Sequence, residues 1–261
     1  MLRFSANLSM LYPELPFLDR FAAAARDGFA GVEYLGPYSE TPRDIADRLA
    51  AHGLTQVLFN LPSGDWARGE RGLGALAGRV EEFQRGVGEA IRYAKLLGCQ
   101  QVNCLAGIPK GVGLTAAEDT LVANLTYAAP RLADAGIKLL LEPINPYDIP
   151  GFFVTSSAQA LRIFDRVQSD NLFLQYDFYH MQRVQGELVA NFKSLMPRIA
   201  HVQIADNPGR NEPGTGEINY GFIFAELERL GYSGWVGAEY KPKTGTSDGL
   251  GWLRSYRGAT A

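Results

Sequence analysis

An alternation of short apolar runs with longer amphipathic runs continues along the chain and constrains its fold more than any other feature. The apolar runs predict strands at residues 2–8, 31–35, 54–61, 100–106, 137–144, 171–177, 199–206 and 234–240. Amphipathic segments separate them, and the four segments PFLDRFAAAARDG, PRDIADRLAAHG, RVEEFQRGVGEAIRYAKLLG and AAEDTLVANLTYAAPRLADAG each end in glycine. Glycine is favoured where a helix ends in a left-handed residue, so these segments are predicted to be helices.

Strict alternation of strands and helices indicates parallel strands joined by crossover helices. Eight such units within 261 residues match one (β/α)8 TIM barrel, predicted as a single domain over residues 1–261. An open doubly wound sheet is the alternative, but it would be unusually long, and no G-x-G-x-x-G follows the first strand. We expect one helix, at residues 186–197, between the sixth and seventh strands.

The longer connections of the predicted barrel all follow strands. They cover residues 62–78, 107–115, 145–155 and 207–219. In barrels of this kind the loops that follow strands build the active site. The mixed-charge segment at residues 64–72 (GDWARGERG) is a candidate lid, with Trp66 as its anchor.

The composition excludes several classes of protein. Hydrophobic residues make up 46% of the chain, and the net charge is -3 with 25 basic and 28 acidic residues. Without a basic run, a nucleic-acid partner is not expected. Cys99 and Cys104 form neither a zinc motif nor a C-x-x-C pair, and they are expected to be buried thiols. The chain shows neither a signal peptide nor an apolar run long enough to span a bilayer, so we expect a cytoplasmic protein without a membrane partner. Barrel enzymes often associate through helix faces, so a homo-oligomer is compatible with the sequence.

Four successive predicted strands each end in an oxygen-bearing side chain. These side chains are Glu142, Asp177, Gln203 and Glu239. Strand side chains alternate between the barrel interior and the helix layer, and all four can face inward at the carboxyl-terminal mouth. Any one of them alone would be interpreted as a helix cap or a solvated loop residue.

Three carboxylates in a small space of low dielectric repel each other unless a proton or a cation lies between them. Three carboxylates and an amide oxygen are hard ligands, which favours one divalent cation, Mg²⁺ or Mn²⁺, over zinc. The sequence therefore predicts a metal site at Glu142, Asp177, Gln203 and Glu239.

Long stretches of the chain resemble the hydroxypyruvate isomerase family, within the xylose-isomerase-like barrel superfamily. The resemblance runs over RFSANLSML (3–11), NLPSGDWARGERG (60–72), EPINPYDIPGF (142–152), QYDFYHMQR (175–183), HVQIADNPGRNEPGTGEINY (201–220) and GWVGAEYKP (234–242). These stretches also look similar in 2-oxo-tetronate isomerases. The resemblance implies a divalent metal held by the four residues above, with Glu142 and Glu239 as the acid/base pair.

The activity implied by this resemblance is an aldose–ketose isomerisation of a small oxo acid. Hydroxypyruvate would be converted into tartronate semialdehyde (2-hydroxy-3-oxopropanoate) when one proton moves from C3 to C2 through an enediolate. His180 and Arg210 are the candidates for binding the substrate, because an arginine fork suits a planar carboxylate. Lys241, just after Glu239, is a further candidate for this role, although adjacent residues of a strand point to opposite faces.

Several other readings compete with this one. The 2-oxo-tetronate isomerase has the same chemistry on a substrate that is one carbon longer, and a ketose 3-epimerase would act on a neutral sugar. An endonuclease for abasic DNA shares the superfamily but has a histidine-rich site, whereas this chain has only 3 histidines. A binding protein without catalysis would have no need for the acid/base pair Glu142 and Glu239.

Overall fold

The strands of the protein close into one parallel barrel in the order β1 to β8, and β8 pairs with β1. This computed structural model describes residues 1–258, and the last three residues of the predicted domain lie outside them. The strands are β1 (Arg3–Asn7), β2 (Gly31–Tyr34), β3 (Thr55–Asn60), β4 (Gln101–Cys104), β5 (Lys138–Leu141), β6 (Leu172–Asp177), β7 (Ile199–Ile204) and β8 (Trp235–Ala238). The (β/α)8 TIM barrel predicted from the alternation is confirmed.

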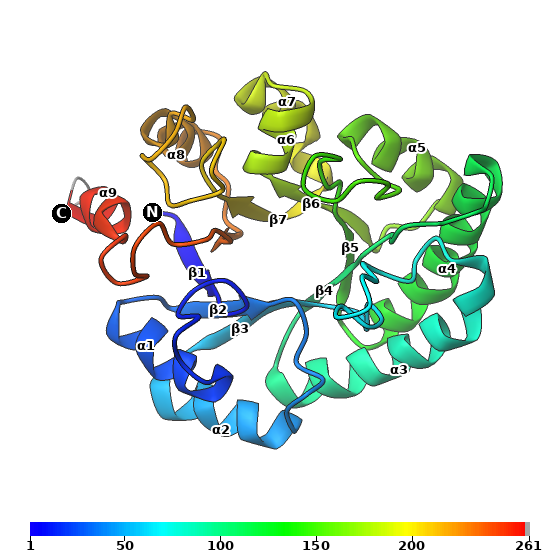
Figure 1. The fold of residues 1–261 in the computed structure, drawn as a ribbon, viewed down its shortest axis with the longest axis horizontal. Helices are drawn as coiled ribbons and strands as arrows, with labels where there is room; N and C mark the ends of the chain where they lie inside the picture. Colours follow the sequence, from blue (N-terminus) through cyan, green and yellow to red (C-terminus); the bar gives the residue numbers. More distant parts are fainter. Residues whose placement is uncertain (259–261) are drawn as a thin grey trace.

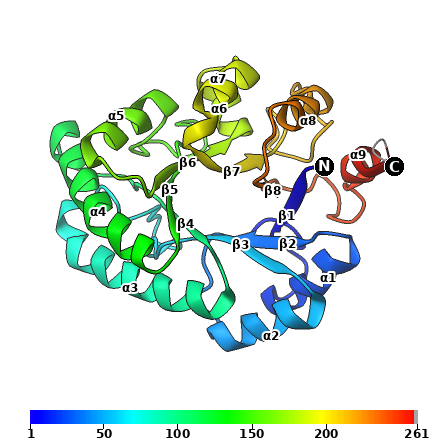
Figure 2. The same cartoon turned by 180° about the vertical axis from the view of Figure 1, so that it is seen from behind.

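Helices surround this ring of strands on its outer side, as Figures 1 and 2 show from opposite directions. They are α1 (Arg20–Arg26), α2 (Pro42–His52), α3 (Val80–Leu97), α4 (Leu114–Asp134), α5 (Ser157–Val167), α6 (Phe178–Val184), α7 (Leu188–Leu195), α8 (Tyr220–Arg229) and α9 (Gly251–Gly258). Within residues 1–258 no helix has the length and apolarity that crossing a membrane requires.

Glycine and short polar residues determine where the helices end and begin. Gly53 and Gly98 terminate α2 and α3 with φ of 62° and 66°, in the left-handed region that favours glycine. Thr41 caps the start of α2 by accepting a hydrogen bond from the Asp44 backbone N–H at 3.2 Å, and Ser156 does the same for α5. These local signals explain why the sequence alone located most of the helices.

Two helices, α6 and α7, lie between β6 and β7, where the sequence pattern predicted only one. Asp177 is the last residue of β6 and also the N-cap of α6, because its carboxylate accepts a hydrogen bond from the Tyr179 backbone N–H at 2.8 Å. The strand therefore passes into the helix without a loop. The sequence contains no turn signal at this point, which is why α6 was missed.

Apolar side chains fill the barrel near the strand starts, and polar side chains occupy its middle. Leu140 packs with Val57 and Leu58 in the lower layer. Higher in the barrel, Gly237 faces the Glu33 carboxylate, and a Cβ at this position would collide with it. The polar groups of the barrel interior therefore lie between this apolar layer and the carboxyl ends of the strands.

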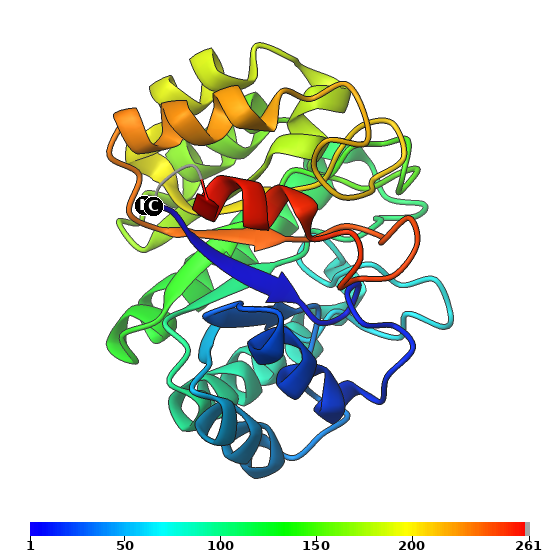
Figure 3. The same cartoon turned by 90° about the vertical axis from the view of Figure 1, so that its left-hand side faces the viewer.

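The long loops gather at the carboxyl ends of the strands, toward which the β1 and β8 arrows point in Figure 3. Helix α9 lies beside the start of β1, and the Leu2 backbone N–H donates a hydrogen bond to the Tyr256 hydroxyl at 2.8 Å. The last helix thus packs against the first strand.

Candidate active site

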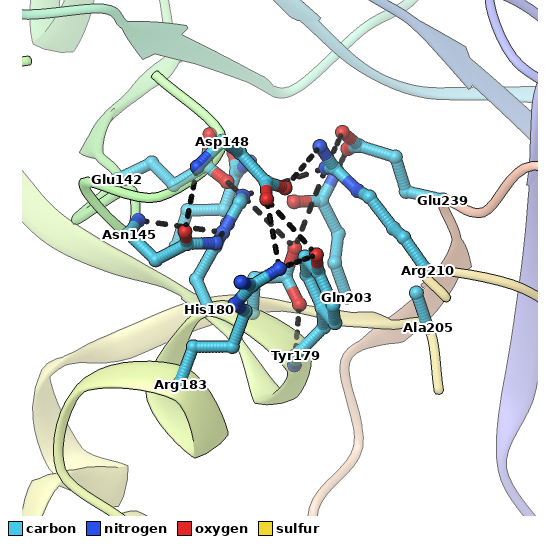
Figure 4. Close-up of polar contacts among 12 residues, drawn as sticks. Glu142, Asn145, Asp148, Tyr179, His180, Arg183, Gln203, Ala205, Arg210 and Glu239 are labelled. Carbon is cyan, nitrogen blue, oxygen red and sulfur yellow. Dashed lines mark hydrogen bonds and ion pairs between the residues drawn. The ribbon is translucent and has the colours of Figure 1, made fainter. Parts of the chain in front are cut away.

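A cavity of about 380 Å³ lies at the carboxyl ends of the strands. Its lining includes Glu142 after β5, His180 in α6, Arg210 in the loop after β7 and Glu239 after β8. Figure 4 shows these side chains converging from separate elements. The volume is within the usual range for small-molecule sites.

A second cavity, of about 600 Å³, lies at the opposite end of the barrel among Arg3, Lys138, Trp235 and neighbouring residues. Its lining contains neither a carboxylate nor a histidine. A site without such groups lacks the side chains that most often transfer protons. We therefore place the candidate chemistry in the smaller cavity.

The three carboxylates Glu142, Asp177 and Glu239 are all buried. Burial raises the pKa of Asp177 to about 6 and that of Glu239 to about 8, because a charged carboxylate is poorly solvated there. Burial, together with the charges of Glu239 and Asp177, also raises the pKa of Glu142 well above its ordinary value. The protein therefore holds three carboxyl groups that a cation would help to ionise.

Two oxygen atoms of these carboxylates are buried without a hydrogen-bond partner in the described chain, Glu142 Oε1 and Asp177 Oδ2. Buried polar atoms are nearly always paired, and an unpaired one often marks a place for an ion, a water molecule or a ligand. One ligand atom from each of Glu142, Asp177 and His180 lies within 4.8 Å of the others. The carboxylate oxygens of this cluster are hard donors, which fit a divalent cation.

His180 lies on the first turn of α6 and is buried. Its Nε2 is 3.5 Å from Asp177 Oδ2 and 3.7 Å from Glu142 Oε1. Burial and the nearby charges of Arg210 and Arg183 hold its pKa well below the ordinary value for histidine. His180 is therefore a neutral imidazole inside the carboxylate cluster.

Gln203, the fourth predicted ligand, lies beside Glu239 but presents its nitrogen to the carboxylates. Its Nε2 donates to Glu33 Oε1 at 2.8 Å and to Glu239, whereas its Oε1 accepts a hydrogen bond from Gln175 at 2.6 Å. Carboxylates attract the amide NH₂ group and repel the amide oxygen when no cation is between them. Coordination by Gln203 Oε1 would require the amide to turn over.

Glu33 forms a layer of hydrogen bonds directly beneath these groups. Its carboxylate accepts hydrogen bonds from Ser5 at 2.7 Å and from His201 Nε2 at 2.9 Å, in addition to Gln203. Burial alone would raise the pKa of Glu33, but the contacts with His201, Gln203 and Ser5 outweigh that effect and lower it. Glu33 is thus an ionised carboxylate that orients Gln203.

Arg210 brings positive charge into the cluster from the loop after β7. Its Nη2 donates to Glu239 Oε1 at 2.8 Å and lies 3.9 Å from Asp177 Oδ2, while Nη1 is 3.5 Å from Asp148 Oδ2. Its side chain is 13% exposed, so the guanidinium lies at the boundary between the cluster and the cavity. There it partly offsets the repulsion among the carboxylates.

Two further cations, Lys241 and Arg71, line the cavity. Lys241 was named as a candidate from the sequence, and the argument against its direction was wrong, because it lies two residues after Glu239 and strand side chains repeat their direction every second residue. Arg71 stacks on Trp66, 4.4 Å from the ring centre, and donates to the backbone oxygens of Trp66 and Glu70. Neither cation forms an ion pair with a carboxylate within residues 1–258.

The loop that carries Arg210 is held by a buried carboxylate beneath it. Asp206 accepts hydrogen bonds from the backbone N–H groups of Gly214 and Gly216 at 2.9 Å each, and from Ile218 at 3.0 Å. These backbone N–H groups already donate to the Asp206 carboxylate and cannot also bind an anion. The glycine-rich turn is therefore a structural element. It fixes the path of the chain near Arg210.

Comparison with known proteins places this chain in a family. Residues 21–256 match the family model of the xylose isomerase-like TIM barrel. The chain is 53% identical to the hydroxypyruvate isomerase of Escherichia coli (strain K12) over 98% of its length and 100% of that protein. It is 47% identical to the 2-oxo-tetronate isomerase of Cupriavidus necator over 98% of its length and 99% of that protein.

Solved structures agree with this placement. A crystal structure from Brucella melitensis, named as an AP endonuclease of family 2, superimposes with a TM-score of 0.96 at 45% identity and covers 98% of this chain and 99% of that one. A D-allulose 3-epimerase from Methylomonas sp. superimposes with a TM-score of 0.79 at 20% identity, over 100% of this chain and 99% of that one, and so shares the fold. The chain therefore belongs to the xylose isomerase-like TIM barrel family, in the group that includes hydroxypyruvate isomerase and 2-oxo-tetronate isomerase, and it is an isomerase.

Proposed function

We propose that this isomerase uses a divalent cation to interconvert hydroxypyruvate and 2-hydroxy-3-oxopropanoate. The observation that carries the proposal is a pair of buried oxygens without a hydrogen-bond partner in the described chain, Glu142 Oε1 and Asp177 Oδ2, beside the cavity that Glu142 and Glu239 line. The substrate class is taken from the relatives named hydroxypyruvate isomerase and 2-oxo-tetronate isomerase.

Glu142, Asp177 and Glu239 would hold the cation, with Gln203 as a fourth ligand once its amide has turned. These are hard oxygen donors, which favour Mg²⁺ or Mn²⁺. When bound, such a cation acts as a Lewis acid that stabilises negative charge on substrate oxygens. The raised pKa values of the carboxyl groups support the proposal, because binding a cation would relieve the cost of ionising them.

Glu142 and Glu239 are proposed as the acid/base pair. They follow β5 and β8 and approach the cavity from well-separated positions on the ring of strands. One carboxylate would remove the proton from C3 of hydroxypyruvate, and the resulting enediolate would receive a proton at C2 from the other. The hydroxyl proton moves from O3 to O2. Substrate and product are therefore isomers, and the reaction needs no external oxidant or reductant. Positioned groups of this kind contribute about 10²–10⁴-fold to the rate.

His180 and Arg210 are proposed to bind the oxygen atoms of the substrate near the reacting carbons. Arg210 already pairs with Glu239, so the carboxylate of the substrate needs further positive charge. Lys241 and Arg71 line the cavity without a carboxylate partner in the described chain, and we assign this role to them. A neutral ketose has no group that would need these two cations, which favours an acid substrate over the substrate of a ketose 3-epimerase.

The 2-oxo-tetronates are the alternative substrates. They have the same reacting unit and one additional carbon, and the cavity of about 380 Å³ has room for either acid. Neither substrate is a nucleic acid, and we propose no nucleic-acid partner. The relative named as an AP endonuclease makes DNA cleavage a useful control reaction.

A substrate panel tests this proposal. The purified protein would be stripped with a chelator, reloaded with Mg²⁺ or Mn²⁺, and incubated with hydroxypyruvate, 2-oxo-tetronates, neutral ketoses and an abasic DNA duplex, with products identified by NMR. We expect turnover of the acids only with metal present. The Glu142→Gln variant should be inactive, and Glu81→Gln, whose side chain is 94% exposed on α3, is the matched control. Full activity of verified metal-free protein, or turnover of ketoses or DNA alone, would contradict the proposal.

A further inference from the structure

Asn145 is a buried residue beside the cavity, and the orientation of its side-chain amide is determined by the backbone. Its Oδ1 accepts hydrogen bonds from the backbone N–H groups of Tyr147 at 3.0 Å and Asp148 at 2.9 Å. An amide nitrogen cannot accept hydrogen bonds, so the oxygen must occupy this side. The NH₂ group therefore faces the opposite way, toward His180, as Figure 4 shows.

His180 Nδ1 meets two N–H groups of the same residue. Asn145 Nδ2 is 2.7 Å from Nδ1, and the Asn145 backbone N–H points at the same atom across 3.4 Å. A ring nitrogen that faces two donors must accept and cannot carry a proton. Because neutral imidazole carries one proton, that proton is on Nε2.

We infer that Asn145 is a positioning residue that holds His180 in the neutral tautomer with its proton on Nε2. The tautomer follows from these hydrogen bonds alone. Its use in catalysis rests on the proposed function.

The tautomer determines what His180 can do in the cavity. Nε2 is 3.4 Å from Arg210 Nη2, and with this tautomer both atoms are donors. Asp177 Oδ2 already lies beside both donors, 3.5 Å from Nε2 and 3.9 Å from Nη2, and the two donors can also serve a further acceptor in the cavity. An oxygen of the substrate that gains negative charge during enolisation is such an acceptor.

The same tautomer excludes His180 from the metal site. A histidine that ligates a metal through one nitrogen normally donates the N–H of the other nitrogen to a carbonyl or a carboxylate. In His180 the second nitrogen accepts from Asn145 instead, so Nε2 has no lone pair free to coordinate. The proximity of His180 to Glu142 and Asp177 therefore reflects substrate binding rather than coordination.

NMR of the full chain labelled with [¹⁵N]histidine reads the tautomer directly and needs no substrate. Only 3 histidines occur, and the spectrum of a His180→Gln variant identifies the signals of His180. We expect the wild-type ring to show an unprotonated Nδ1 and a protonated Nε2. A protonated Nδ1 in the wild-type protein would overturn the inference.

Asn145→Asp is the sharpest variant, because the carboxylate keeps the shape but accepts a hydrogen bond where the amide donated one. It should move the proton of His180 to Nδ1 and lower kcat by about 10²–10³-fold, the effect of losing one oxyanion donor. Asn191→Asp is the matched control, since Asn191 donates to the Gly186 backbone oxygen on the outer side of the barrel. An unchanged His180 spectrum in a folded Asn145→Asp protein would contradict the claim that Asn145 determines the tautomer of His180.

The affinity of the protein for Mn²⁺ shows whether His180 is a hydrogen-bond donor to the substrate or a metal ligand. Mn²⁺ binding to His180→Phe, whose side chain has no ligand atom, should stay within about threefold of wild type when measured by calorimetry, whereas loss of a ligand or of its supporting contacts costs about 10–100-fold. A loss of tenfold or more would overturn the exclusion of His180 from the metal site. If hydroxypyruvate is not turned over but the tautomer is as described, the proposed function fails and the positioning role of Asn145 stands.

Discussion

The stability of the metal-free protein should fall as the pH rises from 6 to 7.5. Burial raises the pKa of Glu239 from its ordinary value of 4.5 to about 8. In this pH interval the folded protein keeps a proton on Glu239, whereas the unfolded chain has released it. The folded state therefore binds more protons than the unfolded state, so the free energy of unfolding decreases with increasing pH.

The magnitude follows from the linkage relation. One proton of difference between the two states changes the free energy of unfolding by about 1.4 kcal/mol per pH unit. Over 1.5 pH units Glu239 alone gives a loss of about 2 kcal/mol, which corresponds to about 4–8 °C in Tm for a chain of this size. Glu142, whose pKa is also raised, adds to the loss in the same direction.

Thermal unfolding in the presence of a chelator, recorded at several pH values, measures this loss. Glu239→Gln is the matched comparison, because it keeps the shape of the side chain but cannot ionise, and its loss should be smaller by about 2 kcal/mol. Saturating Mn²⁺ should raise the Tm of the wild-type protein more at pH 7.5 than at pH 6. A wild-type Tm that stays constant or rises between these pH values, or an equal loss in Glu239→Gln, would refute the reasoning.

Three further outcomes are expected. Glu142→Gln should lower kcat on hydroxypyruvate by about 10²–10⁴-fold with unchanged circular dichroism; activity near that of wild type would remove Glu142 from the acid/base pair. Lys241→Met should raise KM for hydroxypyruvate about two- to fivefold with little change in kcat, because an exposed charge pair contributes about 0.2–1 kcal/mol; an unchanged KM would exclude Lys241 from substrate binding. Gly237→Ala should lower stability by about 1–3 kcal/mol, since the added Cβ collides with Glu33, and a Tm equal to that of wild type would contradict the tight packing of this layer.

The fold was predictable because its signals are local and repeated. Short apolar runs predicted the strands, and glycines such as Gly53 and Gly98 predicted the ends of helices. Helix α6 escaped prediction because Asp177 ends a strand and caps a helix at once. Because no loop separates β6 from α6, the sequence contains no glycine, proline or polar cluster that would mark the boundary between them.

The candidate site was only partly accessible from sequence. Counting along the strands could bring Glu142 and Glu239 to one end of the barrel, and correct counting would also have placed Lys241 beside them. The orientation of the side-chain amides of Gln203 and Asn145 could not be predicted by counting along the strands. Whether Gln203 and Asn145 present oxygen or nitrogen depends on partners that are distant in sequence or on the backbone path, such as Gln175 and the N–H group of Asp148.

Anomalous diffraction from crystals grown with Mn²⁺ tests most directly whether the three carboxylates bind one cation. We predict one strong peak among Glu142, Asp177 and Glu239, within coordination distance of carboxylate oxygens and out of reach of His180 Nε2. The absence of a peak in the cavity, or a manganese ion bound elsewhere on the barrel, would contradict the claim that these carboxylates hold a metal.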